Sequence, residues 1–325
     1  MRIGRIVGIP QVMGWQLAAV AVVLAVGRPW PTAVGVALAA VAAVVVTSAR
    51  IRGRFLYAWA PAAASFLFRA RTRDLGVPAV AGRELLYLLA PEATGGAEDD
   101  ICMLSLRTGM TAVLRPTGPV PEPAALLPPD SGQPLMVQVV YHVGGDRPPR
   151  SWIALHTPRT VDSHADPEVR TALANAVRRV SRQLRRAGVP ARGLPEHELL
   201  GTLAALAHVN GGRGRIREEW GHWSSGTVAQ ATYHLGEWAD LPGPAGARLT
   251  QRLLTAVPQA AVTIAVIARR DGSSTATLRA AAPTRGDLER AVLTLTRVAQ
   301  AEGIVLTPHD GRHLRALAST LPLGI

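Results

Sequence analysis

The sequence predicts an α+β protein: a two-helix transmembrane hairpin at the N-terminus, followed by a cytoplasmic α/β sandwich domain. Three observations predict this fold class. Two long apolar runs without charge stand near the start of the chain, at 9–26 and 32–49. From about residue 75, amphipathic helical patterns alternate with short β-branched segments. Residues 227–325 show the order βαββαβ, which is typical of a ferredoxin-like sandwich.

The two apolar runs define the predicted hairpin, residues 1–54. Each run is near the lower length needed to cross a hydrocarbon core of ~30 Å at 1.5 Å per residue. Between them lies Gly27-Arg28-Pro29-Trp30-Pro31. The two prolines stop helices, and Trp30 is a side chain typical of the lipid–water interface.

The placement of arginine predicts the orientation of the hairpin. Five arginines flank it and one lies in its loop: Arg2, Arg5, Arg50, Arg52 and Arg54, with Arg28 between the helices. By the positive-inside rule, both termini of this predicted multi-pass membrane protein are expected in the cytoplasm. A cleaved signal peptide and a buried hairpin of a soluble protein are the alternatives, and the second uncharged run argues against the signal peptide.

Residues 55–74 form a predicted interfacial segment. They contain all three phenylalanines of the chain and lie between two clusters of arginine. Each arginine near an anionic leaflet contributes about 1 kcal/mol, so anionic lipid headgroups are expected partners. Packing on a partner subunit is the other interpretation. The predicted membrane-interface residues are Trp30, Phe55, Tyr57, Trp59, Phe66, Phe68, Arg50, Arg52, Arg54, Arg69, Arg71 and Arg73.

The net charge of the chain is +12, and the distribution of this charge along the sequence argues against nucleic acid as a partner. Residues 1–73 contain nine arginines and no acid, so three quarters of the excess lies beside the apolar hairpin. A DNA-binding protein is expected to carry its basic patch on the folded domain. The single cysteine, Cys102, excludes an internal disulfide and fits a reducing compartment.

The cytoplasmic domain is expected to span 75–325, with two possible halves at 75–210 and 215–325. In the first half we expect strands within 100–115, 135–143 and 151–156, an exposed loop at 117–134, and helices at 166–187 and 195–208. In the second half we expect strands at 227–238, 260–269, 274–281 and 304–307, and helices at 245–256, 285–302 and the C-terminus. Thr284 is a predicted helix cap.

The helix after Pro167 is predicted to begin with Asp166 as its N-cap. Its apolar face comprises Val169, Leu173, Val177, Val180 and Leu184, and the opposite face Arg178, Arg179, Arg182, Arg185 and Arg186. Such a face is either solvated or docks on an acidic partner or the membrane. We take Arg178, Arg182 and Arg185 as candidate docking residues. Trp220, Trp223 and Trp238 are further candidates, since clustered tryptophans form a core or anchor an interface.

The sequence contains no motif that predicts a catalytic, cofactor-binding or metal-binding residue. His156, Asp162, His164 and Asp166 lie close in sequence, but their spacing matches no metal-site pattern. The stretch 309–313 holds two histidines and an aspartate at a strand-to-helix turn and is equally unspecific. The glycine-rich stretch 211–214 lacks the lysine of a phosphate loop.

The layout resembles the EccE family, a membrane subunit of the actinobacterial type VII (ESX-type) secretion machinery. The hairpin with its arginine-rich aromatic segment carries the resemblance, as do Glu219-Trp220-Gly221-His222-Trp223, Ala231-Thr232-Tyr233-His234 with Trp238, and Ser319-Thr320-Leu321-Pro322-Leu323-Gly324. The resemblance implies a non-enzymatic subunit beside EccB, EccD and the ATPase EccC, supporting assembly or stability of the pore. It supplies no catalytic residue.

Two functions of other classes stay open at this point. A membrane-tethered enzyme, transferase-like and acting at the cytoplasmic leaflet, would need a pocket lined by groups such as His156, Asp162 and His164. A DNA-tethering membrane protein is disfavoured by the nearly balanced charge of residues 74–325.

Overall fold

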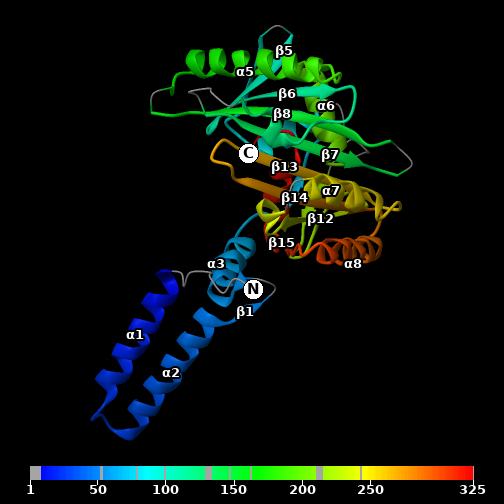
Figure 1. The fold of residues 1–325 in the computed structure, drawn as a ribbon. Helices are drawn as coiled ribbons and strands as arrows, with labels where there is room; N and C mark the ends of the chain where they lie inside the picture. Colours follow the sequence, from blue (N-terminus) through cyan, green and yellow to red (C-terminus); the bar gives the residue numbers. More distant parts are fainter. Residues whose placement is uncertain are drawn as a thin grey trace. The chain divides into compact units, whose positions relative to one another are not determined.

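The computed structural model describes residues 9–51, 54–77, 80–98, 100–128, 134–145, 148–161, 163–209, 215–241 and 244–324. The chain divides into two compact units, Met1–Arg69 and Ala70–Ile325 (Figure 1).

Unit 1 contains two apolar helices that pack against each other, α1 (Ile9–Ala25) and α2 (Trp30–Ser48). The amide of Gln11 donates to the carbonyl of Thr47 at 3.0 Å, and the indole of Trp15 donates to Ser48 at 3.2 Å. Gly14 allows the close approach, because a Cβ there would lie 2.9 Å from Cγ2 of Thr47. Length and hydropathy suit α2 for crossing a membrane, whereas α1 is shorter. The prediction that the chain crosses twice stays a prediction.

The rest of unit 1 is the predicted interfacial segment. Strands β1 (Arg50–Ile51) and β2 (Arg54–Phe55) pair, and α3 (Leu56–Leu67) follows with Pro61 inside it. The segment ends earlier than the sequence suggested: unit 1 closes at Arg69, and 72–74 form a strand in the sheet of unit 2.

Unit 2 is built on a thirteen-stranded antiparallel sheet in the described residues. Along the sheet the order is β3-β10-β11-β12-β14-β13-β7-β8-β6-β5-β4, while β15 pairs with β12 and β9 with β6. The strands are β3 (Thr72–Asp74), β4 (Thr94–Glu98), β5 (Ile101–Leu106), β6 (Gly109–Pro116), β7 (Met136–Val143), β8 (Arg150–Pro158), β9 (Ala191–Gly193), β10 (Arg215–Glu218), β11 (Trp223–Ser225), β12 (Val228–Leu235), β13 (Ala261–Arg269), β14 (Ser274–Ala282) and β15 (Leu306–Pro308). The predicted α+β class is therefore confirmed, and the large antiparallel sheet is a finding of the structure.

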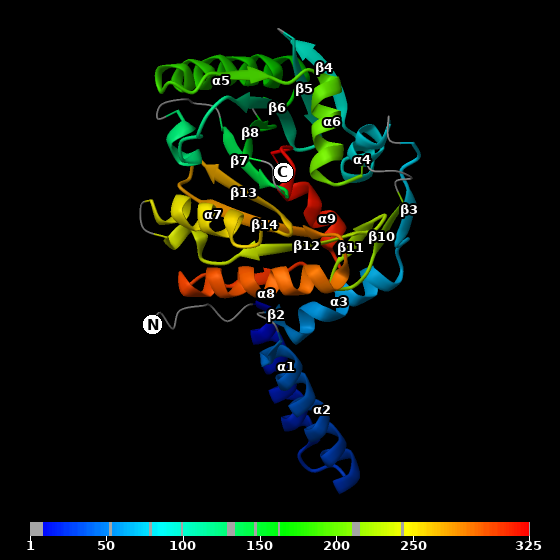
Figure 2. The same cartoon turned by 90° about the vertical axis from the view of Figure 1, so that its right-hand side faces the viewer.

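Helices cover both faces of this sheet (Figure 2). On one face lie α5 (Asp166–Arg186), α7 (Ala245–Thr255), α8 (Arg285–Ala301) and the short helix η1 (Pro123–Leu126). On the other face lie α4 (Ala81–Leu89), α6 (Glu196–Leu206), α9 (His313–Leu317) and the short helix η3 (Ala318–Thr320). Alternation along a strand separates the two cores: Val113 packs with α6, and its neighbours Ala112 and Leu114 pack with α5.

Strands of both predicted halves share the one sheet, since β7 pairs with β13 through partners such as Val139 and Val266. The C-terminal elements follow the predicted order βαββαβ, and their strands pair as β15-β12-β14-β13. Because these strands belong to a larger sheet, the separate ferredoxin-like sandwich stays a prediction.

Three local expectations can be compared with the structure. Thr284 caps α8 as predicted, accepting from the backbone N–H of Asp287 at 3.1 Å. The prediction of Asp166 as the N-cap of α5 was wrong, because Ala165 is the N-cap and Asp166 is the first helical residue. The carboxylate of Asp166 pairs with Arg159 at 2.6 Å. The loop expected to be exposed at 117–134 instead contains η1, which buries Leu126 completely.

Candidate functional site

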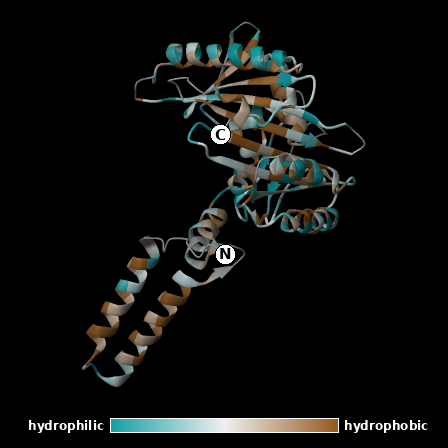
Figure 3. Cartoon of the chain, in the orientation of Figure 1, coloured by the Kyte–Doolittle hydropathy of each residue, from teal (hydrophilic) through white to brown (hydrophobic). Residues whose placement is uncertain are grey.

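The hairpin of unit 1 has an apolar exterior. No residue of α2 is buried, although twelve of its nineteen residues are alanine or valine. Leu17, Leu24, Leu38 and Val41 are each exposed by 61–69 %. Figure 3 shows apolar residues around both helices. Contiguous apolar surface on this scale marks a membrane or protein contact, because water makes its exposure costly.

The predicted membrane-interface residues differ in their exposure. Trp30 is 78 % exposed and Phe68 is 91 % exposed, whereas Phe66 is buried beneath Arg69, whose guanidinium lies 5.7 Å from the ring centroid. Partly buried positions are held by Phe55, Tyr57 and Trp59. Arg71 and Arg73 are exposed on or beside β3 of unit 2. Arg50 and Arg54 lie in β1 and β2, and Arg52 lies outside the described residues.

Helix α5 separates its apolar and basic residues as predicted. The buried side chains of its apolar face are Val169, Leu173, Val177, Val180 and Leu184, and the exposed arginines are Arg178, Arg179, Arg182, Arg185 and Arg186. Arg178 pairs with Glu98 of β4 at 3.7 Å, so it is not a free cation. In the described part of the chain, the other four arginines have no acidic partner. We call Arg179, Arg182, Arg185 and Arg186 the arginine face.

Two of the three candidate tryptophans are core residues. Trp223 is fully buried on β11 between α6 and the C-terminal segment. Trp238 is 8 % exposed and packs with α7. Trp220 is partly buried and contacts the turn at Gly311, where a Cβ would lie 2.7 Å from its ring. As folded, Trp223 and Trp238 stabilise unit 2 and offer no side chain to a partner.

The described members of the histidine–aspartate group, His156, His164 and Asp166, form no cluster that could hold a metal ion. His156 is 1 % exposed, lies 2.9 Å from the hydroxyl of Thr111, and has its pKa lowered to about 4 by burial. His164 is exposed in the loop before α5, and Asp162 lies outside the described residues. Among the residues described, no group of three His, Cys, Asp or Glu could hold a metal ion.

The stretch 309–313 ties α9 to the sheet. The imidazole of His313 accepts from the backbone N–H of Thr232 at 3.0 Å and lies 3.7 Å from the carboxylate of Asp310. Nearby, the buried carboxylate of Glu218 accepts from the N–H of Leu314 at 3.1 Å. These contacts give the polar residues of this stretch a structural role.

Sequence reasoning missed a buried cation, Arg279 on β14, which is 1 % exposed. Its guanidinium donates to Gln230 at 2.6 Å and to Thr263 at 3.3 Å, and burial lowers its pKa to about 9. No carboxylate pairs with it in the part of the chain that is described. Burial lowers the pKa of nearby His208 to about 4, and the charge of Arg279 adds to that effect. An arginine amid the apolar stretch 276–282 was the signal available in the sequence.

Two hollows of unit 2 are lined by described residues, and neither of these linings brings acids together. One, of about 600 Å³, lies between α4 and α6; its carboxylate, Glu196, is already paired with Arg83 at 2.9 Å. The other, of about 210 Å³, lies between η1 and α7, with Tyr141 and Glu122 in its lining. Catalysis by paired acids needs convergent carboxylates, and these linings do not supply them.

The described residues thus present two exposed features: an apolar hairpin in unit 1 and, in unit 2, an arginine face without an acidic partner. The predicted resemblance to EccE is confirmed by a family model, "Putative type VII ESX secretion system translocon, EccE", which matches residues 151–235. The match covers about a quarter of the chain, from β8 to β12, and includes α5. It implies a subunit of a type VII secretion translocon. No curated protein matches the chain.

Proposed function

We propose that this protein is a non-enzymatic structural subunit of a type VII secretion complex in the inner cell membrane, where it supports assembly or stability of the export machinery. The family match over 151–235 carries the proposal. The lack of a metal-ligating cluster in the described residues agrees with a contact role. Its expected partners are the other membrane subunits, EccB, EccD and the ATPase EccC.

The proposal includes anchoring by the hairpin. The apolar exterior of α1 and α2 would lie in lipid, with Trp30 and the arginines and aromatic residues of 50–69 at the two interfaces. Both crossings and the cytoplasmic placement of both termini belong to the proposal. The arginine asymmetry between the ends of the hairpin and its loop supports that orientation.

Co-purification tests the function. The tagged full-length protein is extracted from membranes in a mild detergent, and mass spectrometry identifies what accompanies it. We expect the secretion ATPase and the other membrane subunits. Purification of the protein alone, from membranes in which those subunits are present, would contradict the proposal.

A truncation tests the anchor separately. Because 72–74 pair with β10 in the sheet of unit 2, the cut belongs after Arg69. Without 1–69 the protein should be soluble and should no longer purify with the complex. Sedimentation of the truncated protein with membranes would show that unit 2 has a membrane contact of its own.

A further inference from the structure

Unit 2 repeats one arrangement twice. In the first half, four strands lie side by side in the order β9-β6-β8-β7, and in the second half four lie in the order β15-β12-β14-β13. In chain order each set reads first strand, second strand, third strand, helix, fourth strand, and between its first two strands the first set has the short helix η1 where the second set has α7. The two sets join through their second strands, β7 and β13, which run antiparallel. An antiparallel joint between equivalent strands is the geometry of a twofold axis.

The register supports this equivalence residue by residue. The first strands, β6 and β12, have 8 residues each, and the third strands, β8 and β14, have 9 each. The sixth residue of the first strand pairs with the third residue of the fourth strand in both halves, as Leu114 with Gly193 and as Tyr233 with Pro308. The paired residues Val140 and Ala265 lie at the joint and share one core cluster.

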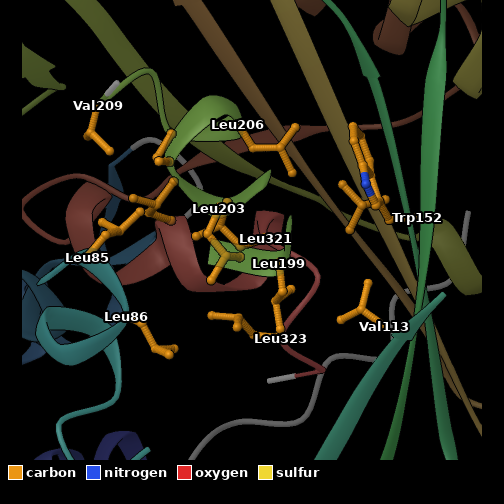
Figure 4. Close-up of a cluster of buried hydrophobic side chains, with 14 of the residues drawn as sticks. Leu85, Leu86, Val113, Trp152, Leu199, Leu203, Leu206, Val209, Leu321 and Leu323 are labelled. Atoms are coloured by element: carbon orange, nitrogen blue, oxygen red, sulfur yellow. The ribbon is translucent and has the colours of Figure 1, made fainter. Parts of the chain in front are cut away.

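The ends of the two halves cap each other reciprocally. Thr111, third in β6, donates to the carbonyl of Leu323 at 2.7 Å, and Gln230, third in β12, donates to the carbonyl of Ala207 at 2.8 Å. Each carbonyl is followed by a residue with a left-handed backbone, Gly324 at φ +70° and His208 at φ +54°. Figure 4 shows the side chains of α6 and of the C-terminal segment meeting over Trp152 and Val113.

The outer helices α5 and α8 occupy equivalent places, because α5 packs on β6 and β8 and α8 packs on β12 and β14. Their charges differ. After Glu168, α5 carries six arginines and no acid. On α8, Arg285 pairs with Glu289 at 2.9 Å and Arg290 pairs with Asp287. The arginine face is therefore not a general property of this position in the fold; it belongs to the first half.

We propose that 94–209 and 215–324 are two copies of one folding unit, and that the arginine face of the first copy docks on an acidic surface of a partner protein, a contact that α8 does not make. This proposal rests on the proposed function only in expecting the partner among the translocon subunits. Arg182, Arg185 and Arg186 lie on about one turn of α5, and their backbone positions span about 6 Å along the helix axis. A partner segment with carboxylates on neighbouring turns fits that spacing.

A protein surface fits the arginine face better than a lipid surface does. Helices that lie in a membrane interface combine basic residues with exposed large apolar side chains. After the first turn of α5, the exposed residues are Thr171, Asn175, Gln183 and the arginines from Arg178 on, and every valine and leucine of the helix is buried. Guanidinium groups, in contrast, bind carboxylates through paired, directional hydrogen bonds.

The first experiment uses full-length protein and a matched control from the second half. Arg182→Glu, Arg185→Glu and Arg186→Glu are combined in one variant, and Arg285→Glu, Arg290→Glu and Arg297→Glu in the other. Both change the net charge equally on exposed helix positions. In the α5 variant we expect the amount of one co-purifying subunit to fall by more than about tenfold, because glutamates at these positions repel an acidic partner that the arginines attract. The α8 variant should retain it. Equal retention by both variants overturns the docking proposal.

The second experiment identifies what covers the arginines. Phenylglyoxal modifies accessible arginines, and mass spectrometry reads each position in the purified complex, in the protein alone, and in nanodiscs of phosphatidylcholine with or without phosphatidylglycerol. We expect Arg182, Arg185 and Arg186 to be protected only in the complex. Protection that needs phosphatidylglycerol would assign the face to lipid, and protection lost on nuclease treatment would assign it to nucleic acid; either result overturns the proposal. If the wild-type protein brings no subunit with it, the proposed function fails before the docking test is reached.

Discussion

At the scale of single residues, the informative positions are the buried polar ones. His156, Gln230 and Arg279 are each exposed by no more than 1 %. The polar partners of His156 and Arg279 are neutral, and Gln230 is the acceptor for the guanidinium of Arg279. Burial of a charged form costs free energy unless a counter-charge or hydrogen bonds replace the lost water. These residues therefore make the stability of unit 2 sensitive to pH and to the loss of one partner.

His156 predicts a pH dependence of stability. Burial lowers its pKa to about 4 in the folded protein, whereas the unfolded chain binds a proton near the ordinary value of about 6.5. The unfolded state thus binds more protons between these values, so stability falls as the pH drops through this window, by about 3 kcal/mol for this histidine. In His156→Asn, whose amide can still reach Thr111, thermal unfolding of the full-length protein should depend less on pH. The exposed His164→Asn is the control, and an unchanged slope in His156→Asn would contradict the prediction.

Arg279 predicts an asymmetry between two substitutions. Arg279→Met removes the buried cation and leaves only neutral acceptors, so we expect a loss of about 1 kcal/mol or less. Gln230→Leu keeps the cation and removes its acceptor at 2.6 Å, so we expect a loss of about 3 kcal/mol. Denaturant unfolding of the two variants measures both. A larger loss for Arg279→Met would mean that the guanidinium stabilises the fold, against this reasoning.

At the scale of elements, periodicity explains what could be predicted. The helix at 166–186 and the strands at 261–269 and 274–282 were found because one face of each is continuously apolar. The N-cap of α5 was misplaced by one residue: the carboxylate of Asp166 pairs with Arg159, the residue after β8, a contact that no local pattern contains. The burial of Trp223 and of Arg279 likewise depends on strands distant in sequence.

Helices α4 and α6 provide a matched pair of glycines. A Cβ on Gly82 would lie 2.2 Å from the carbonyl oxygen of Leu200, whereas a Cβ on Gly201 would meet nothing within 4 Å. Gly82→Ala should therefore force the helices apart and cost about 2 kcal/mol. Gly201→Ala should stabilise α6 by about 0.5–1 kcal/mol, because alanine is the better helix former. Thermal unfolding of both variants reads the difference, and equal effects would mean that the two helices are not in close contact.

At the scale of the whole molecule, the sequence predicted the division into an apolar anchor and a folded domain, but not how the domain is joined. The proposed halves 75–210 and 215–325 lie close to the two repeated units, 94–209 and 215–324, yet nothing in the sequence indicated that β7 and β13 pair into one sheet. The pairing of β7 with β13 joins strands that lie far apart in the sequence. No local pattern of side chains in either half predicts that pairing. The exposure of the arginines of α5 could be predicted, because an amphipathic helix is a local pattern; their docking role stays a proposal.

The orientation of the anchor leads to a test on the intact membrane. Cys102, the natural cysteine, is 2 % exposed, and burial together with the charge of Glu196 raises its pKa to about 11, so it should not react with a maleimide in the folded protein. Engineered cysteines then report position without background. In right-side-out membranes, Arg28→Cys in the hairpin loop should react with a membrane-impermeant maleimide, whereas His197→Cys on α6 should react only after the membrane is opened. Reaction of His197→Cys in sealed membranes would place unit 2 outside the cytoplasm and reverse the orientation that the arginines predict.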